Sequence, residues 1–183
     1  MPKIILAVVG LPGAGKTETV NYLIKKKNWP KVYFGDVTLD EVKKRGLEVN
    51  EVNERKTREE IRKNLGMGAY AILNLPKIKK LFENGSVVVE SLYSWEEYIE
   101  VKKEFGDDFK VLAIYSSPET RIARLTNRPI RPLNREDVIL RDYAQIQNLN
   151  MTGPIARADW TIVNEGTKEN LYKQIDKILE KII

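Results

Sequence analysis

The sequence predicts an α/β fold in which a five-stranded parallel sheet is flanked by helices. Five short apolar runs alternate with helical segments along the 183 residues, and this alternation is typical of a parallel, doubly wound sheet. The first apolar run, residues 4–9, leads directly into a glycine-rich segment and then into a helix. No repeat or low-complexity linker divides the chain, so we expect one domain over residues 1–183.

The expected strands and helices end at residues that disfavour their continuation. The first helix stops near Pro30, the next two stop at Gly46 and Gly66, and Asn84-Gly85 precedes the third apolar run. Ser117-Pro118 suits the N-cap and first position of a later helix. We therefore expect strands over residues 4–9, 32–34, 87–89, 110–115 and 160–163. We expect helices over residues 16–27, 37–45, 51–65, 70–82, 95–105, 136–148 and 168–182, one more after Ser117, and a kink or join at Pro76.

The glycine-rich segment carries the motif G-x-x-x-x-G-K-T from Gly10 to Thr17. Between a strand and a helix, this motif is typical of the P-loop, whose backbone N–H groups and helix N-terminus bind a polyphosphate. Lys16 is placed to reach the β- and γ-phosphates of ATP, and the Thr17 hydroxyl is placed to bind Mg²⁺. The alternative is a glycine turn that binds no ligand. We favour a P-loop NTPase that binds ATP through Gly10, Gly13, Ala14, Gly15, Lys16, Thr17 and Glu18.

The composition excludes several kinds of catalytic site. The sequence has no cysteine, which excludes thiolate nucleophiles and thiolate metal sites, and no histidine, which removes the usual general base at neutral pH. Phosphoryl transfer suits this restriction because it depends on positioning and charge neutralisation more than on proton transfer. The net charge of +5 allows a nucleic-acid partner, but we do not favour one because a nucleotide substrate explains the charge equally well.

The apolar segments are all short, and none approaches the roughly 20 residues of a membrane span. Met1-Pro2-Lys3 leads straight into the first strand, so we expect no cleaved leader. We expect a cytoplasmic protein with a small-molecule substrate and no membrane partner, and the oligomeric state is left open.

Two carboxylates follow predicted strands at the sheet edge where ligands of such folds bind. Glu90 follows the third apolar run and is predicted to lie near Mg²⁺, with a solvated carboxylate as the alternative. Asp36 follows the second strand. It is predicted to contact a substrate hydroxyl and act as a base, or to cap the helix that begins at Val37.

Arginines are densest from residue 121 to residue 141, and Pro129 and Pro132 interrupt this stretch. The pattern predicts a lid-like segment over residues 127–147 that closes over phosphates with planar, bidentate donors. A solvated basic face or an RNA-binding patch is the alternative. We predict that Arg121 binds ATP, and that four arginines take part in catalysis: Arg124, Arg128, Arg131 and Arg135.

An insertion over residues 46–68 is the candidate acceptor side. Arg58 and Arg62 lie four residues apart on a predicted helix and are expected to bind an acceptor phosphate. Because Glu54, Glu59 and Glu60 lie beside them, intrahelical ion pairs explain the pattern equally well.

These motifs resemble those of the adenylate-kinase-like nucleoside monophosphate kinases. The resemblance rests on the P-loop, Gly35-Asp36, the stretch from Arg62 to Ala69 and the arginine-rich lid. The segment Ala158-Asp159-Trp160-Thr161-Ile162-Val163-Asn164-Glu165-Gly166 is similar to that of dephospho-CoA kinases, and closer to that of archaeal-type adenylate-kinase-related proteins. The resemblance implies an NMP-binding-type insertion over residues 46–68, a lid-type insertion over residues 127–147, and an adenine bordered by Asn164 and Gly166.

Two positions depart from the pattern of that group. Leu39 stands where an arginine usually follows the second strand, and Tyr93 stands where one follows the third. The ATP side is intact. We expect an acceptor pocket that favours a stacked, less highly charged group.

The sequence thus predicts an ATP- and Mg²⁺-dependent phosphotransferase that acts on a nucleotide-like small molecule. Asp36, Arg58, Arg62 and Tyr93 are its candidate substrate-binding residues. A dephospho-CoA kinase, with Asp36 as the base for a ribose hydroxyl, is an alternative. A nucleotide-dependent switch or RNA-associated ATPase is the alternative from another functional class.

Overall fold

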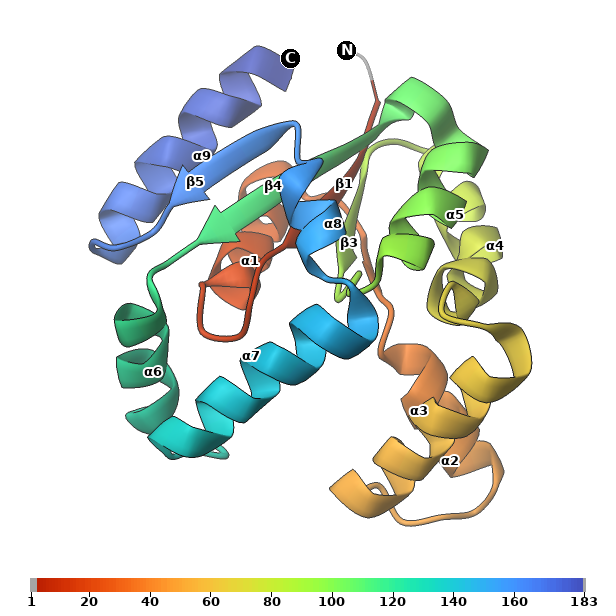
Figure 1. Ribbon diagram of the computed structural model, residues 1–183. Helices are drawn as coiled ribbons and strands as arrows, with labels where there is room; N and C mark the ends of the chain where they lie inside the picture. Colours follow the sequence, from red (N-terminus) through yellow and green to blue (C-terminus); the bar gives the residue numbers. More distant parts are fainter. Residues whose placement is uncertain (1–2, 183) are drawn as a thin grey trace.

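Five parallel strands form the centre of the computed structural model, which describes residues 3–182 (Figure 1). Met1 and Pro2, which are expected to lead straight into the first strand without a cleaved leader, lie outside the described residues. The strands run in the order β2-β3-β1-β4-β5, so β1 lies in the middle and pairs Ile5 with Val87 on one side and with Phe109 on the other. The predicted parallel sheet is confirmed. The strands are β1 Ile5–Val9, β2 Lys31–Tyr33, β3 Val87–Glu90, β4 Phe109–Tyr115 and β5 Trp160–Val163.

Helices cover both faces of this sheet and extend beyond the carboxyl ends of its strands (Figure 1). One face packs against α1 (Lys16–Lys27) and α9 (Lys168–Ile182). The other packs against α4 (Ala69–Glu83), α5 (Trp95–Phe105) and α8 (Thr152–Ala156), and Gly106–Asp108 adds a short 3₁₀ turn after α5. Beyond the strand ends lie α2 (Asp36–Lys44), α3 (Glu51–Leu65), α6 (Pro118–Thr126) and α7 (Arg135–Leu149). No helix within residues 3–182 is long and apolar enough to cross a membrane.

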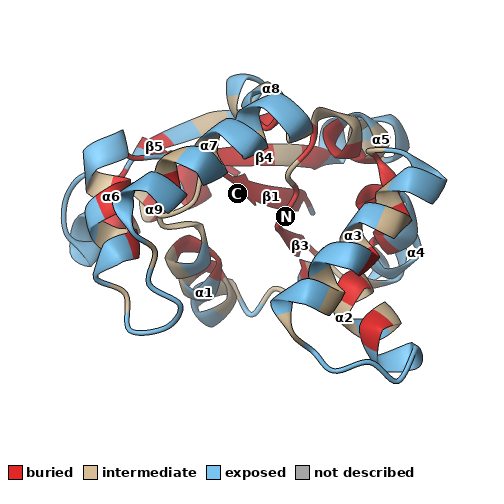
Figure 2. Ribbon diagram, turned by 60° about the horizontal axis from the view of Figure 1, so that its bottom comes forward, coloured by how far each residue is buried: buried red, intermediate tan, exposed pale blue. Residues whose placement is uncertain are grey.

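The central strand is buried on both faces, which explains why its sequence is continuously apolar instead of alternating. Successive side chains of a strand point to opposite faces. Ile5, Ala7 and Val9 therefore join the core under α4 and α5, whereas Leu6 and Val8 join the core under α1 and α9. The buried residues follow the strands through the middle of the molecule (Figure 2).

The helices begin and end close to their expected positions, with three differences. Helix α8 was not predicted because its five residues include Gly153 and Pro154, which disfavour helices. It forms because it packs closely on α5, where a Cβ on Gly153 would lie 2.6 Å from Trp95. Pro76 lies inside the continuous helix α4. Asp36 is the first residue of α2, with Gly35 at the N-cap, so the capping role for Asp36 is wrong.

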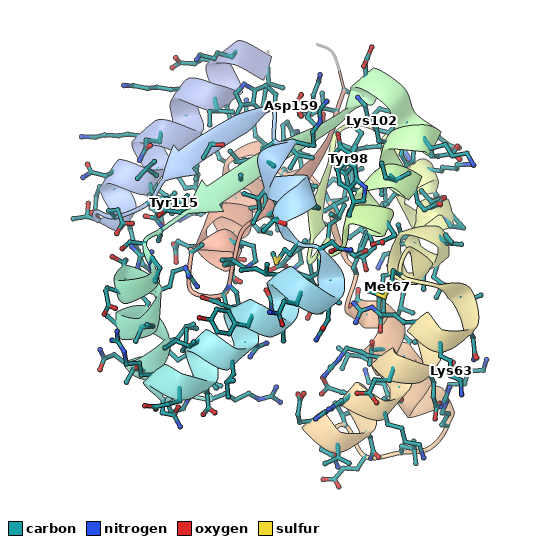
Figure 3. The ribbon with its side chains drawn as sticks, in the orientation of Figure 1. Lys63, Met67, Tyr98, Lys102, Tyr115 and Asp159 are labelled. Carbon is teal, nitrogen blue, oxygen red and sulfur yellow. The ribbon has the colours of Figure 1, made fainter. Side chains whose placement is uncertain are left out.

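The start of β5 is fixed by Asp159 (Figure 3). Its carboxylate accepts a 2.8 Å hydrogen bond from the backbone N–H of Val111 in β4, and its own N–H donates to the Val111 carbonyl at 2.9 Å. A second oxygen of Asp159 lies 3.4 Å from Nζ of Lys110. This part of the Ala158–Gly166 motif therefore aligns two strands, and the residues that follow β5 reach the P-loop.

A buried ion pair joins α6, α7 and the P-loop. The Arg121 guanidinium lies 2.8 Å and 2.7 Å from the two carboxylate oxygens of Asp142, with side-chain exposures of only 4% and 13%. Arg121 also donates to the backbone carbonyls of Ser116 at 3.2 Å and Pro12 at 3.3 Å. Helix α7 is thereby held against the loop that follows β1.

We predict that Asp142→Ala lowers the free energy of unfolding by about 3 kcal/mol or more, because it leaves the Arg121 charge buried and unpaired. Denaturant unfolding measures this change. The control is Glu119→Ala, which removes an ion pair to Arg135 whose partners are 71% and 54% exposed, and should lower the free energy of unfolding much less than Asp142→Ala does. Equal losses in the two variants would contradict the structural role assigned to the buried pair.

Candidate active site

The P-loop connects β1 to α1 and wraps tightly because of its glycines. Gly15 has φ +108°, in the left-handed region, and a Cβ there would lie 2.4 Å from the side-chain nitrogen of Asn164. Only glycine fits this position without strain. Asn164 Nδ2 in turn donates to the Ala14 carbonyl at 2.8 Å. The residue after β5 therefore sets the conformation of the loop after β1.

Lys16 lies inside the loop, where its Nζ donates to the carbonyls of Gly10 at 2.7 Å and Leu11 at 3.1 Å. Burial lowers the pKa of Lys16 to about 8. The positive charge of Arg141 lowers this pKa further, and the negative charge of Glu90 opposes the shift. The lysine predicted to contact the β- and γ-phosphates is thus already held at the loop.

Two oxygen ligands lie together at the start of α1. The Thr17 hydroxyl lies 3.4 Å from Oε1 of Glu90, while Oε2 of Glu90 pairs with Nζ of Lys31 at 2.9 Å. A hydroxyl and a carboxylate suit Mg²⁺, which takes oxygen ligands and keeps several waters. No group of three histidine, cysteine, aspartate or glutamate side chains within residues 3–182 is placed to hold a metal ion. Thr17 and Glu90 therefore fit an ion whose other ligands are phosphate oxygens and water.

The predicted catalytic residue Arg124 and two further residues predicted to bind ATP, Glu18 and Gly166, lie near the loop or beyond β5. Arg124 donates to the Asn164 carbonyl at 2.9 Å and to the Gly13 carbonyl at 3.4 Å. The Glu18 carboxylate faces α9, where it accepts hydrogen bonds from Tyr172 and from Nζ of Lys168. Gly166 is exposed beyond β5.

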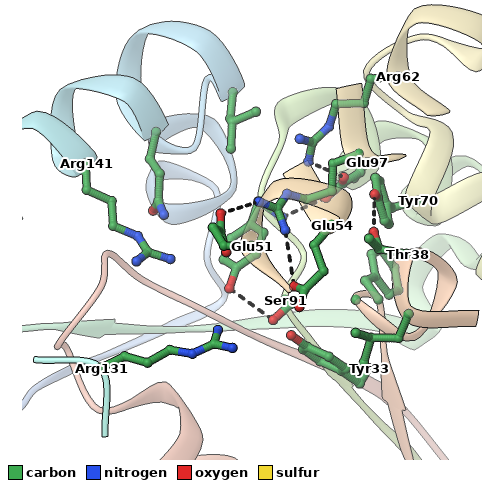
Figure 4. Close-up of a pocket in the computed structure, with 17 residues that line it drawn as sticks. Tyr33, Thr38, Glu51, Glu54, Arg62, Tyr70, Ser91, Glu97, Arg131 and Arg141 are labelled. Carbon is green, nitrogen blue, oxygen red and sulfur yellow. Dashed lines mark hydrogen bonds and ion pairs between the residues drawn. The ribbon is translucent and has the colours of Figure 1, made fainter. Parts of the chain in front are cut away.

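A cavity of about 280 Å³ opens beside the P-loop, between α2 and α3 on one side and α7 on the other (Figure 4). Tyr93 belongs to its lining, and the Tyr93 ring centroid lies 6.0 Å from Nζ of Lys16. The cavity therefore borders the P-loop lysine. Its polar lining includes three tyrosines, four arginines and three glutamates: Tyr33, Tyr70, Tyr93, Arg58, Arg62, Arg131, Arg141, Glu51, Glu54 and Glu97.

The structure brings some of the predicted site residues to this cavity and leaves others outside it. Arg58, Arg62, Tyr93 and Arg131 line it, as does Leu39. Four residues predicted to be catalytic do not line the cavity, and their roles stay predictions. Asp36 pairs with Lys77 at 3.2 Å, and Arg135 pairs with Glu119 at 2.9 Å. Arg124 donates to backbone carbonyls, and Arg128 donates to the Arg131 carbonyl at 2.6 Å.

Other lining residues were not among the predicted site residues. Arg141, Gln145 and Leu149 of α7 face the cavity, and their spacing of four residues, which places them on one helix face, is the signal that identifies them. Within residues 3–182, the guanidinium groups of Arg131 and Arg141 have no hydrogen bond or ion pair, and both point into the cavity (Figure 4). Apart from Tyr93, the tyrosines and glutamates of the opposite wall carried no comparable sequence signal.

Glu97 is the most deeply buried acid of the cavity wall, with an exposure of 1%. Its carboxylate accepts hydrogen bonds from the backbone N–H groups of Tyr93 at 2.7 Å and Ser94 at 3.2 Å, and lies 3.8 Å from the Arg62 guanidinium. Arg62 also lies over the Tyr70 ring at 5.0 Å. Glu97 thus connects α3 to the loop that places Tyr93. Its burial outweighs these favourable partners and raises the pKa of Glu97 to about 7.

We predict that the free energy of unfolding of the wild type falls, relative to that of Glu97→Gln, as pH rises from about 4.5 to about 7. In this window the folded state holds the Glu97 proton and the unfolded state has lost it, so rising pH favours unfolding by up to about 3 kcal/mol. Denaturant unfolding of both proteins across this range measures the difference. Parallel pH dependence in the two proteins would contradict a buried carboxyl that titrates near neutrality.

Comparison with known proteins places the chain in a family. A family model described as an AAA domain matches residues 6–142. The UPF0200 protein of Thermococcus onnurineus (strain NA1) is 33% identical over 183 residues, which cover 98% of each chain. Among solved structures, shikimate kinase from Aquifex aeolicus aligns with a TM-score of 0.60 at 19% identity over 97% of each chain. A gluconokinase from Sinorhizobium meliloti 1021 aligns with a TM-score of 0.59 at 10% identity over 99% of this chain and 96% of its own.

The solved structures share the fold of a P-loop kinase, and the expected resemblance to such kinases is confirmed at that level. The kinase subtype is a separate question, which these names leave open. The chain belongs to the AAA-domain family and to the UPF0200 proteins.

Proposed function

We propose that the protein is an ATP- and Mg²⁺-dependent kinase that transfers the γ-phosphoryl group to a nucleotide-like small molecule. The observation that carries this proposal is the cavity that borders Lys16 through Tyr93. A hydrolase needs only water beside its P-loop, whereas a kinase needs a second, formed site for the acceptor. The fold shared with shikimate kinase and gluconokinase supports the same conclusion.

The residues of the P-loop bind and orient ATP in this mechanism. Backbone N–H groups of the loop bind the β- and γ-phosphates, and Lys16 exchanges its two carbonyl partners for phosphate oxygens. Thr17 and Glu90 would hold the Mg²⁺ ion, which neutralises phosphate charge when bound. Asn164 stabilises the conformation of the loop through its hydrogen bond to the Ala14 carbonyl. We propose that Asn164 and Gly166 border the adenine.

The lid supplies further positive charge. Arg131 and Arg141 face the cavity without partners among the described residues, so they are available to donate to the transferred phosphoryl group as its charge develops. Arg128 lies next to this pair, whereas Arg124 and Arg135 would have to leave their present partners to join it. We therefore assign the main catalytic role in the lid to Arg131 and Arg141.

Two alternatives are less well supported. In a dephospho-CoA kinase, Asp36 would be the base, but its carboxylate pairs with Lys77 and does not line the cavity. A nucleotide-dependent switch or RNA-associated ATPase gives no reason for a polar cavity beside Lys16. A cytoplasmic location stays a prediction.

We predict that Lys16→Ala stays folded but loses phosphoryl transfer by roughly a hundred- to a thousand-fold, the usual effect of removing one preorganised charge-stabilising donor. Coupled assays of ADP formation, together with thermal unfolding, measure both properties. The control is Lys25→Ala, which removes an exposed lysine from the same helix and should keep wild-type turnover. Wild-type turnover by a folded Lys16→Ala protein would rule out the kinase proposal.

A further inference from the structure

The two arginines of α3 that face the cavity already lie beside carboxyl groups. Arg58 pairs with Glu51 at 2.8 Å and with Glu54 at 3.5 Å. The Arg58 and Glu54 side chains are partly sheltered, at 32% and 15% exposed, whereas the Glu51 side chain is 67% exposed. Arg62 faces the buried Glu97. The α3 side of the cavity therefore carries three carboxyl groups against two guanidinium groups, and the carboxylates of Glu51 and Glu54 both pair with Arg58.

Such a wall disfavours an acceptor phosphate. A phosphomonoester dianion next to α3 would have to displace Glu51 or Glu54 from Arg58, and it would be repelled by the displaced carboxylate. Leu39 adds an apolar side chain to the same wall. Arg58 is thus not free for bidentate binding of a phosphate, the arrangement that makes arginine selective for such groups.

The same wall suits hydroxyl groups. Ionised carboxylates only accept hydrogen bonds, so Glu51 and Glu54 select donors such as sugar hydroxyls. Tyr33, Ser91 and Tyr93 line the cavity beside them, which adds hydroxyls and aromatic rings (Figure 4). An aromatic ring can stack on a planar base. The opposite wall holds Arg131 and Arg141, whose guanidinium groups have no partner within residues 3–182, so the negative charge of the transferred group belongs there.

On the basis of the proposed kinase function, we propose that the acceptor is a neutral nucleoside, phosphorylated on a hydroxyl, and that Glu51 and Glu54 exclude monophosphates by occupying Arg58. The nucleoside hydroxyl oxygen bonds to the γ-phosphorus while the bond from that phosphorus to the β,γ-bridging oxygen breaks. ADP leaves with the electron pair of that bond, and the hydroxyl proton is released to water. The product is a nucleoside monophosphate.

The test compares kcat/KM for nucleosides and their 5′-monophosphates in the wild type and in the double variant Glu51→Gln, Glu54→Gln. The panel contains adenosine, guanosine, cytidine and uridine with AMP, GMP, CMP and UMP, and phosphorylated products are quantified by chromatography. The wild type should prefer at least one nucleoside over its monophosphate by about tenfold or more. The double variant frees Arg58 and should gain about tenfold in kcat/KM for monophosphates, the effect of one hydrogen bond to a charged group.

The matched control is the double variant Glu59→Gln, Glu60→Gln, which makes the same charge change on the same helix at residues that do not line the cavity. It should keep the wild-type preference, and thermal unfolding checks that both variants fold. Efficient turnover of a monophosphate by the wild type, with no gain in the Glu51, Glu54 variant, would overturn this inference and leave the proposed kinase function standing. ADP formation without any phosphorylated acceptor would overturn both.

Discussion

The buried ion pair between Arg121 and Asp142 is the interaction on which the candidate site depends. Arg121 reaches from α6 to the carbonyl of Pro12 in the P-loop, and its guanidinium fixes α7 through Asp142. The residue next to Asp142 is Arg141, which faces the cavity. Apolar packing between α6 and α7 supports the same arrangement, and the Arg121–Asp142 pair adds the polar connection from α7 to the P-loop.

The two walls of the cavity differ in how their charge is used. The α7 wall presents guanidinium groups without partners among the described residues, whereas the α3 wall pairs each of its arginines with carboxylates inside the protein. In the proposed function, positive charge is therefore available beside the phosphates of ATP and is offset by carboxyl groups beside the acceptor. Glu97 connects the α3 wall to the loop that carries Tyr93. Its carboxyl group lies beside Arg62 of α3 and accepts a hydrogen bond from the backbone N–H of Tyr93.

Much of this arrangement follows from local sequence signals, and the remainder does not. The sheet, the P-loop and the Thr17–Glu90 pair were predictable because a fully buried strand, a glycine motif and a strand-end acid each have their own pattern. The short helix α8 was not, since its stability comes from packing on Trp95 and not from its own residues. The arginines lie in one dense stretch of the sequence, but their tertiary partners differ: Arg121 pairs with Asp142, Arg135 pairs on the surface, and Arg141 faces the cavity.

The measurement that tests the central claim most directly is ³¹P NMR of ATP turnover with Mg²⁺ in the presence of nucleosides. It follows the fate of the γ-phosphorus without any assumption about which acceptor hydroxyl reacts. Phosphoryl transfer predicts a phosphomonoester signal that grows in equal amount with ADP while inorganic phosphate stays low. Stoichiometric inorganic phosphate with no phosphomonoester would show that the cavity beside Lys16 holds no acceptor of this class and that the protein hydrolyses ATP.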